Sequence, residues 1–140
     1  MDKIAQAQGI IARTRPDIAE NRTVYEAILG FYSDSALMET HISDLNYLLK
    51  NKVIKAYKAN AVNFKDCALN LLESHPELVT AKGMLRFYEA TPNFDWQECE
   101  TAEIALGNAL TMDSYGWQPD SWTVFKAQEA MPRLTVVAAF

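Results

Sequence analysis

The chain has 140 residues, of which 49% are apolar and 22% charged, and its net charge is −5. This length suits one domain with a hydrophobic core of its own, and the composition excludes an intrinsically disordered chain. The negative balance also disfavours a protein that binds nucleic acid through its overall charge.

Export and membrane insertion are not expected from the sequence. No apolar run reaches the roughly 20 residues that a transmembrane helix needs, and the opening MDKIAQAQGIIARTR makes a poor signal peptide. Cys67 and Cys99 stand apart and lack CxxC spacing. We therefore expect reduced thiols in a cytoplasmic protein, with one disulfide in a secreted protein as the alternative.

Helical periodicity dominates the first half of the chain. The N-terminal segment is expected to be helical with a break before Pro16, because the residue that precedes a proline avoids the α region. Apolar spacing predicts helices over 24–32 and 34–49. The same period continues from Val53 to Phe64 and on to His75.

The second half is also expected to be helical until close to its end. Pro76 suits the first position of a helix, whose apolar stripe would consist of Leu78, Ala81, Leu85 and Tyr88. Further helices are predicted from Trp96 to Met112 and from Asp120 to Ala130. The tail RLTVVAAF has no obvious partner strand, so we expect it to pack on the helices as an extended segment.

These elements predict an all-α fold. The expected architecture is a single domain over residues 1–140, a compact bundle of about six or seven helices. A short extended C-terminal tail over about 133–140 completes it.

The stretch FDWQECETAE, residues 94–103, contains four carboxylates and a tryptophan. Asp95 as N-cap with Glu98 three positions later is a capping-box arrangement, and acids in a first turn complement the helix dipole. Helix capping therefore explains two of the four carboxylates without any function.

Glu103 and His41 each fall within an apolar arc of a predicted helix. A carboxylate at position 103 would be partly desolvated, which suits proton transfer. It would otherwise reach the rim of the core or pair with a basic side chain from another helix. His41 is expected to be a buried core histidine whose two nitrogens find partners.

Sequence motifs for metals, phosphates and nucleophiles are absent. The two histidines and two cysteines show no HxxxH, HExxH or CxxC spacing, and the chain has no GxGxxG, GxxxxGK[ST] or GxSxG pattern. The sequence therefore predicts no metal site, no cofactor and no enzymatic activity.

A basic stretch runs from Lys50 to Lys65 without an intervening acid. Lys52, Lys55 and Lys58 would project from a helix, away from its apolar stripe. Lysines interleaved with tyrosine and phenylalanine can bind nucleic acid. The alternative is an ordinary solvated helix face.

The region between Arg86 and Lys126 shows the opposite balance, with seven acids, all three tryptophans and no basic residue. Aromatic side chains anchor protein interfaces and charge steers encounter, so this region predicts a docking surface for a basic partner. Its candidate residues are Trp96, Glu98, Glu100, Ile104, Asp113, Tyr115 and Trp117. The alternative is that the tryptophans fill the core and the acids keep the protein in solution.

The sequence thus predicts a small, acidic, non-enzymatic protein that acts through protein–protein contact. It would be an inhibitor or antagonist of the phage anti-defence or immunity type, or an accessory subunit. Its partner would have a basic surface, as nucleic-acid-binding proteins do, and carboxylates would stand in for phosphates. A nucleic-acid-associated protein using Lys50–Lys65 is the alternative, and an enzyme using Glu103 and His41 comes third. The oligomeric state, including a homo-oligomer, is left open.

Overall fold

The computed structural model describes residues 2–32, 41–90, 95–109, 120–126 and 131–140. The elements in chain order are α1 (Lys3–Thr14), α2 (Pro16–Glu20), α3 (Arg22–Gly30), α4 (Ile42–Leu49), β1 (Ile54–Asn60), α5 (Phe64–Ser74), the 3-10 helix η1 (Pro76–Thr80), β2 (Gly83–Ala90), α6 (Trp96–Ala109), β3 (Asp120–Lys126) and β4 (Arg133–Ala139).

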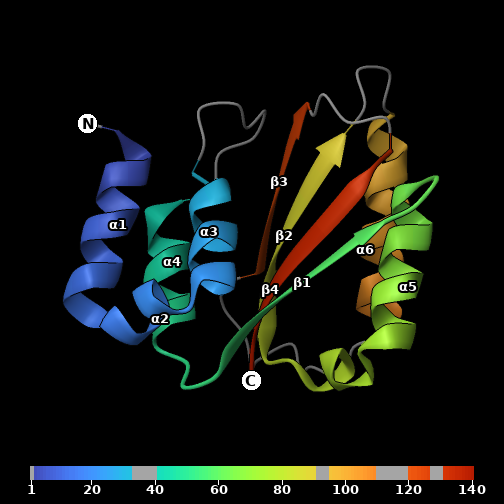
Figure 1. The fold of residues 1–140 in the computed structure, drawn as a ribbon. Helices are drawn as coiled ribbons and strands as arrows, with labels where there is room; N and C mark the ends of the chain where they lie inside the picture. Colours follow the sequence, from blue (N-terminus) through green and yellow to red (C-terminus); the bar gives the residue numbers. More distant parts are fainter. Residues whose placement is uncertain (1, 33–40, 91–94, 110–119, 127–130) are drawn as a thin grey trace.

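The described elements form three layers, in which a four-stranded sheet lies between two layers of helices (Figure 1). The strand order is β1-β4-β2-β3, with β4 antiparallel to both of its neighbours and β2 parallel to β3. Helices α1 to α4 cover one face of the sheet, and α5 and α6 cover the other. The expectation of an all-α bundle is therefore wrong, because the fold is of the α/β class.

The N-terminal helices form as their sequence predicts. Asp2 caps α1 by accepting a hydrogen bond from the amide of Ile4 at 3.0 Å, and α1 ends just before Pro16. Asn21 caps α3 in the same way. The guanidinium of Arg15, at the α1–α2 junction, donates to the carbonyl oxygens of Leu49 and Asn51 and so ties this junction to the end of α4.

Strand β2 occupies a segment for which the sequence predicts a helix. Its side chains alternate, with Met84, Arg86 and Tyr88 towards α5 and α6, and Leu85 and Phe87 towards the N-terminal helices. A strand buried on both faces is a nearly continuous apolar run, which periodicity alone does not distinguish from a buried helix. Only η1, which begins at Pro76, follows the prediction in this region.

Strand β4, predicted to be an extended tail packed on helices, is a central strand of the sheet. It pairs with β1 on one side and with β2 on the other. Leu134, Val136 and Ala138 face one helix layer, and Val137 and Ala139 face the other. The partner strands were missed because both were assigned to helices.

Two further helix predictions fail and one is shortened. Ile54–Asn60 is β1 and Asp120–Lys126 is β3, where the sequence pattern predicts helices. Of the helix predicted over 34–49, the structure describes α4, which begins at Ile42. Residues 34–40 and 127–130 of these predictions lie outside the described residues.

Each face of the sheet has its own hydrophobic core. The core under α5 and α6 includes Phe64, Leu71 and Leu106, and the core under the N-terminal helices includes Ile11, Ile28 and Leu48. Cys67 and Cys99 are buried free thiols in the first core, as the sequence predicts. Among the described residues, no helix combines the length and apolar composition required to cross a bilayer.

Candidate protein-docking surface

Helix α6 is the element that carries the described part of the predicted docking surface. Its start is capped as predicted, because the Asp95 carboxylate accepts a hydrogen bond from the amide of Gln97 at 2.9 Å. Cys99, Ala102 and Leu106 form its buried face against the sheet and α5. The opposite face is therefore fixed in position and turned outward.

That outward face exposes two large apolar side chains. Trp96 and Ile104 are 42% and 63% exposed, and the exposed Glu100 lies between them in sequence. Residues four positions apart lie on one side of a helix, so the three form a continuous strip. We call this set, Trp96, Glu100 and Ile104, the α6 strip.

Glu98 lies on another side of α6, towards α5. It is half-buried and lines a cavity of about 270 Å³ together with Asn63, Lys65 and Thr101. Lys65 brings a positive charge to this cavity, so Glu98 does not extend the acidic strip. The structure thus brings together Trp96, Glu100 and Ile104 and separates Glu98 from them.

The remaining candidates of the predicted surface are not placed. Asp113, Tyr115 and Trp117 lie outside the described residues. Within α6 itself the sequence WQECETAEIALGNA contains three glutamates and no lysine or arginine. Of these glutamates only Glu100 lies on the α6 strip, so the described part of the surface is apolar with one exposed carboxylate.

Glu103 has a structural partner that the sequence analysis did not identify. Arg86 of β2 donates from Nε to both carboxylate oxygens of Glu103, at 3.1 and 2.9 Å, and from Nη1 to the carbonyl of Met84 at 3.0 Å. The hydroxyl of Tyr88 donates to the same carboxylate. The side chains of Arg86 and Glu103 are only 8% and 20% exposed.

This cluster is a clamp between α6 and the sheet. Both oxygens of the Glu103 carboxylate accept hydrogen bonds, so the group is held rather than available to a substrate. Burial, with the nearby Glu103 charge, raises the pKa of the Tyr88 hydroxyl and raises that of the Cys99 thiol to about 12. These neighbours are therefore neutral near pH 7 and unsuited to act as nucleophiles.

The prediction made from the sequence is wrong for His41 and correct for His75. His41 was predicted to be a buried core residue, but it is exposed at the N-cap of α4, where its carbonyl accepts a hydrogen bond from Tyr32 at 3.3 Å. His75 joins α5 to η1 as predicted and packs its ring 4.7 Å from that of Tyr57. His41 and Glu103 belong to elements on opposite faces of the sheet, so they do not form one site.

The basic stretch is on a strand rather than a helix. Lys55 and Lys58 belong to β1, and Lys52 precedes it. All three side chains are exposed, so the prediction that they project outward holds although the helical geometry behind it does not.

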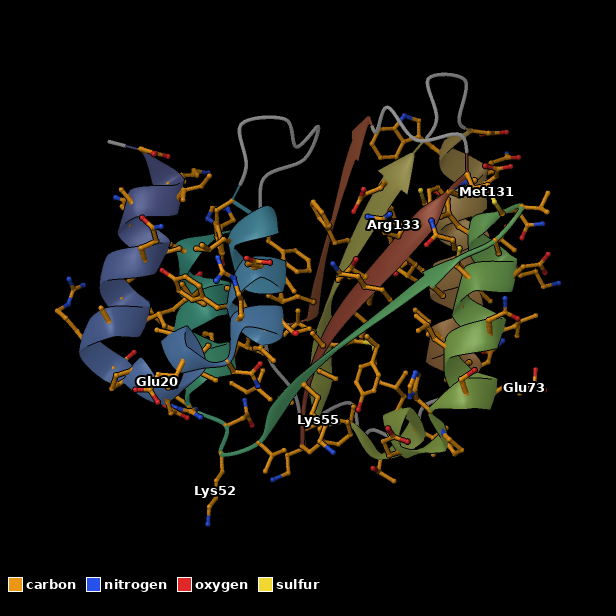
Figure 2. All side chains as sticks on the ribbon, in the orientation of Figure 1. Glu20, Lys52, Lys55, Glu73, Met131 and Arg133 are labelled. Atoms are coloured by element: carbon orange, nitrogen blue, oxygen red, sulfur yellow. The ribbon has the colours of Figure 1, made fainter. Side chains whose placement is uncertain are left out.

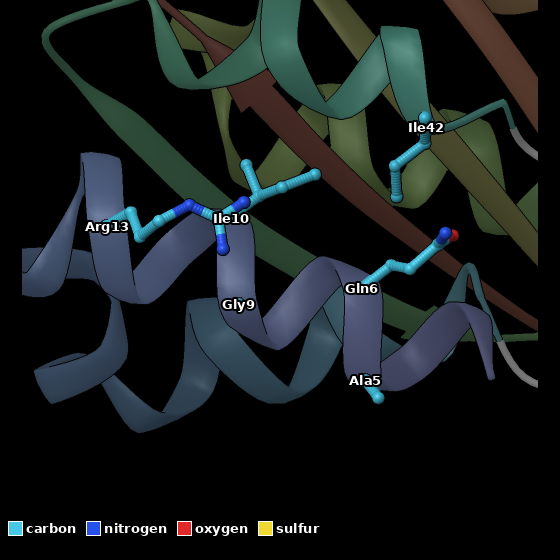
Figure 3. A pocket seen from close by; sticks show the side chains of 6 residues that line it. All are labelled: Ala5, Gln6, Gly9, Ile10, Arg13 and Ile42. Atoms are coloured by element: carbon cyan, nitrogen blue, oxygen red, sulfur yellow. The ribbon is translucent and has the colours of Figure 1, made fainter. Parts of the chain in front are cut away.

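A second cavity lies along α1. Figure 3 shows this cavity of about 390 Å³ with its lining of Ala5, Gln6, Gly9, Ile10, Arg13 and Ile42. These described lining residues offer one guanidinium and one amide but no carboxylate, imidazole or thiol, so they supply no general base. Within the described ranges, no three metal-binding side chains lie close enough together to hold an ion.

Sequence reasoning missed Arg86, which is the residue that explains Glu103. Periodicity offered no signal, because β2 is apolar on both faces and reads as a nearly continuous apolar run. Read as a helix, the segment places Arg86 outside the apolar stripe and beside Glu89 at i+3, which gives no reason to pair it with Glu103.

No protein-family model and no curated protein matches the chain. Among solved structures, the chain is similar to an FtsZ dimer from M. jannaschii, with a TM-score of 0.65 and 12% identity over 87% of this chain and 38% of that one. It is also similar to a point mutant of FtsZ from the same organism, with a TM-score of 0.66 and 13% identity over 87% and 39%.

The likeness to FtsZ shows the fold alone, at this level of identity. The chain spans about two-fifths of the length of these FtsZ chains. The α/β fold overturns the all-α description of the protein, and the likeness gives no support to an inhibitor, anti-defence or nucleic-acid-mimic class.

Proposed function

We propose that the protein is a non-enzymatic binding protein of the cytoplasm that docks a protein partner with a basic surface on the α6 strip. The observation that carries this proposal is the exposure of Trp96 and Ile104 on an acidic helix whose other face is fixed in the core. The two free, buried cysteines support the cytoplasmic location.

Energetics favour this strip as the centre of an interface. Fully burying an exposed isoleucine is worth about 1.5–3 kcal/mol, and tryptophan is enriched among the residues that dominate binding energy. Glu100 between them would contribute mainly to the rate and orientation of encounter with a positively charged partner.

A second copy is a poor occupant of the same strip. Two α6 helices packed face to face would bring Glu100 of both copies together without any basic residue from either helix. The proposed partner is therefore a different protein that presents lysine or arginine around an apolar centre.

Site-specific photo-crosslinking tests the proposal. Ile104 is replaced by the photo-crosslinker p-benzoylphenylalanine, and the protein is irradiated in cells of its native host. We expect one dominant crosslinked partner, whose formation is reduced by Glu100→Lys because charge reversal repels a basic surface.

Two matched controls sharpen this test. Leu69 on α5 is also an exposed apolar residue, at 44%, so the crosslinker in its place reports non-specific capture. Glu73→Lys makes the same charge change on α5. Identical products from positions 69 and 104, or an equal loss with either charge reversal, would contradict the proposal.

A further inference from the structure

The hydrogen bonds at the two ends of β1 show which of its residues bond to β4 and which direct their backbone groups outward. The amide of Phe140 donates to the carbonyl of Val53 at 3.0 Å, and the amide of Ala61 donates to the carbonyl of Pro132 at 3.2 Å. Bonded positions alternate in an antiparallel pair. The odd-numbered residues of β1 therefore pair with β4, and the even-numbered ones direct their N–H and C=O groups outward.

These outward groups form an open edge. β1 is the terminal strand of the sheet, and in the described part of the chain no backbone partner is recorded for the outward groups of Ile54, Ala56, Lys58 and Asn60. An edge of this kind is a template for an additional strand.

A groove runs beside the first half of this edge. A cavity of about 250 Å³ lies between the start of α3, represented by Asn21 and Val24, and the segment Ile54–Tyr57 of β1. Glu77 of η1 also lines it, but its carboxylate already accepts a hydrogen bond from the Tyr57 hydroxyl at 3.2 Å. The edge is thus accompanied by space in which another chain can lie.

The exposed lysines along β1 determine which kind of chain can pair with its open edge. Lys52, Lys55 and Lys58 are all exposed along or just before β1, although the whole chain carries −5. Figure 2 shows Lys52 pointing away from the fold and Lys55 near the start of the strand. A second copy of β1 would add its own lysines to this edge, which disfavours self-pairing.

We propose that the open edge of β1 binds an extended, acid-bearing segment of a protein partner as an additional strand of the sheet. Main-chain hydrogen bonds to the even-numbered residues would supply the pairing. Lys55 shares the face of Tyr57 and Lys58 that of Ala56, so the two lysines lie on opposite faces of the sheet. One carboxylate on each face of the added strand would therefore meet one lysine. This site is separate from the α6 strip and does not depend on it.

A synthetic peptide provides the test. The probe matches the seven residues of β1 in length and consists of valines with two glutamates three positions apart, so that one carboxylate lies on each face of the added strand. Amide hydrogen exchange is followed by NMR with and without it. We expect the amides of Ala56 and Lys58 to exchange about tenfold or more slowly when the peptide is bound, while that of Tyr57, already paired with β4, changes little.

Variants and a second probe make each outcome decisive. Lys55→Glu with Lys58→Glu should weaken peptide binding by about tenfold, whereas Lys65→Glu on α5 should not. No binding at millimolar peptide, equal weakening by Lys65→Glu, or protection without the odd–even pattern would overturn the proposal. Tighter binding of an oligothymidylate than of the peptide would overturn it in favour of nucleic acid.

Discussion

Arg86 and Glu103 form an ion pair in which the arginine is buried and the glutamate is partly buried. A buried pair of this kind adds little net stability relative to apolar residues, but the loss of one partner leaves an uncompensated charge. The Tyr88 hydroxyl and the carbonyl of Met84 are also hydrogen-bonded to the pair. The pair therefore fixes how α6 sits on β2.

Replacing Glu103 by alanine should destabilise the protein strongly. We expect the free energy of unfolding to fall by about 3–5 kcal/mol, because the buried guanidinium of Arg86 loses the carboxylate to which its Nε donates twice. Glu100→Ala, at an exposed position of the same helix, should change it by less than about 0.5 kcal/mol. Urea unfolding followed by circular dichroism measures both.

The double variant Arg86→Met with Glu103→Leu separates charge from packing. It should recover most of the stability lost in Glu103→Ala, since it removes both charges together. A double variant as unstable as the single one would show that the clamp acts through shape rather than charge.

Alkaline pH should weaken the fold through its buried thiols. Burial raises the pKa of Cys67 from its ordinary value of 9.0 to about 11. The folded state thus favours the neutral thiol, and that contribution is complete below pH 9 and lost as pH rises from 9 to 11. Cys67→Ala should show a smaller loss of stability over this interval in urea titrations at several pH values.

At the scale of the element, helix ends follow local rules. Asn63 caps α5 by accepting a hydrogen bond from the amide of Asp66 at 2.8 Å. Asn63→Ala should therefore cost about 1 kcal/mol of stability, whereas Asn70→Ala, at an exposed position within α5, should cost nothing. An equal loss in both variants, measured by thermal unfolding, would remove the capping explanation.

Elements with strong local signals could be predicted from the sequence, and the strands could not. The starts of α1, α3 and α6 can be recognised from a few neighbouring residues. Their caps are Asp2, Asn21 and Asp95, whose side chains accept hydrogen bonds from amides two or three residues ahead. The pairing of Tyr57 with Val136 joins distant parts of the chain and leaves no local trace. Strands that are buried on both faces are nearly continuous apolar runs, and the sequence pattern alone predicts them as helices.

The candidate site shows the same division. The outward turn of Ile104 follows from helical spacing within α6 and could be predicted. The engagement of Glu103 by Arg86 could not, because it requires knowing that β2 is a strand and lies beneath α6. The separation of Glu98 from Glu100 likewise depends on where α5 packs.

At the scale of the whole molecule, one sheet is shared by two cores. β4 contributes Val136 to one core and Val137 to the other, so neither core can form without it. We therefore expect the two cores to unfold together.

Matched cavity-forming variants test this coupling. Leu71→Ala in α5 and Ile28→Ala in α3 should each lower the free energy of unfolding by about 2–5 kcal/mol. Both should leave a single transition that coincides by tryptophan fluorescence and far-UV circular dichroism. Two separate transitions in either variant would show that the cores are independent units.

The central place of β4 has a consequence for how the chain is made. During translation β1 and β2 are synthesised before β4. These two strands do not pair with each other, because β4 lies between them in the sheet. The nascent sheet must therefore wait, with the apolar faces of β1 and β2 open, until residue 139 has emerged. Contacts so far apart along the chain also form slowly. The interval before β4 arrives is thus when a chaperone, or the same strands of a neighbouring nascent chain, has most opportunity to bind.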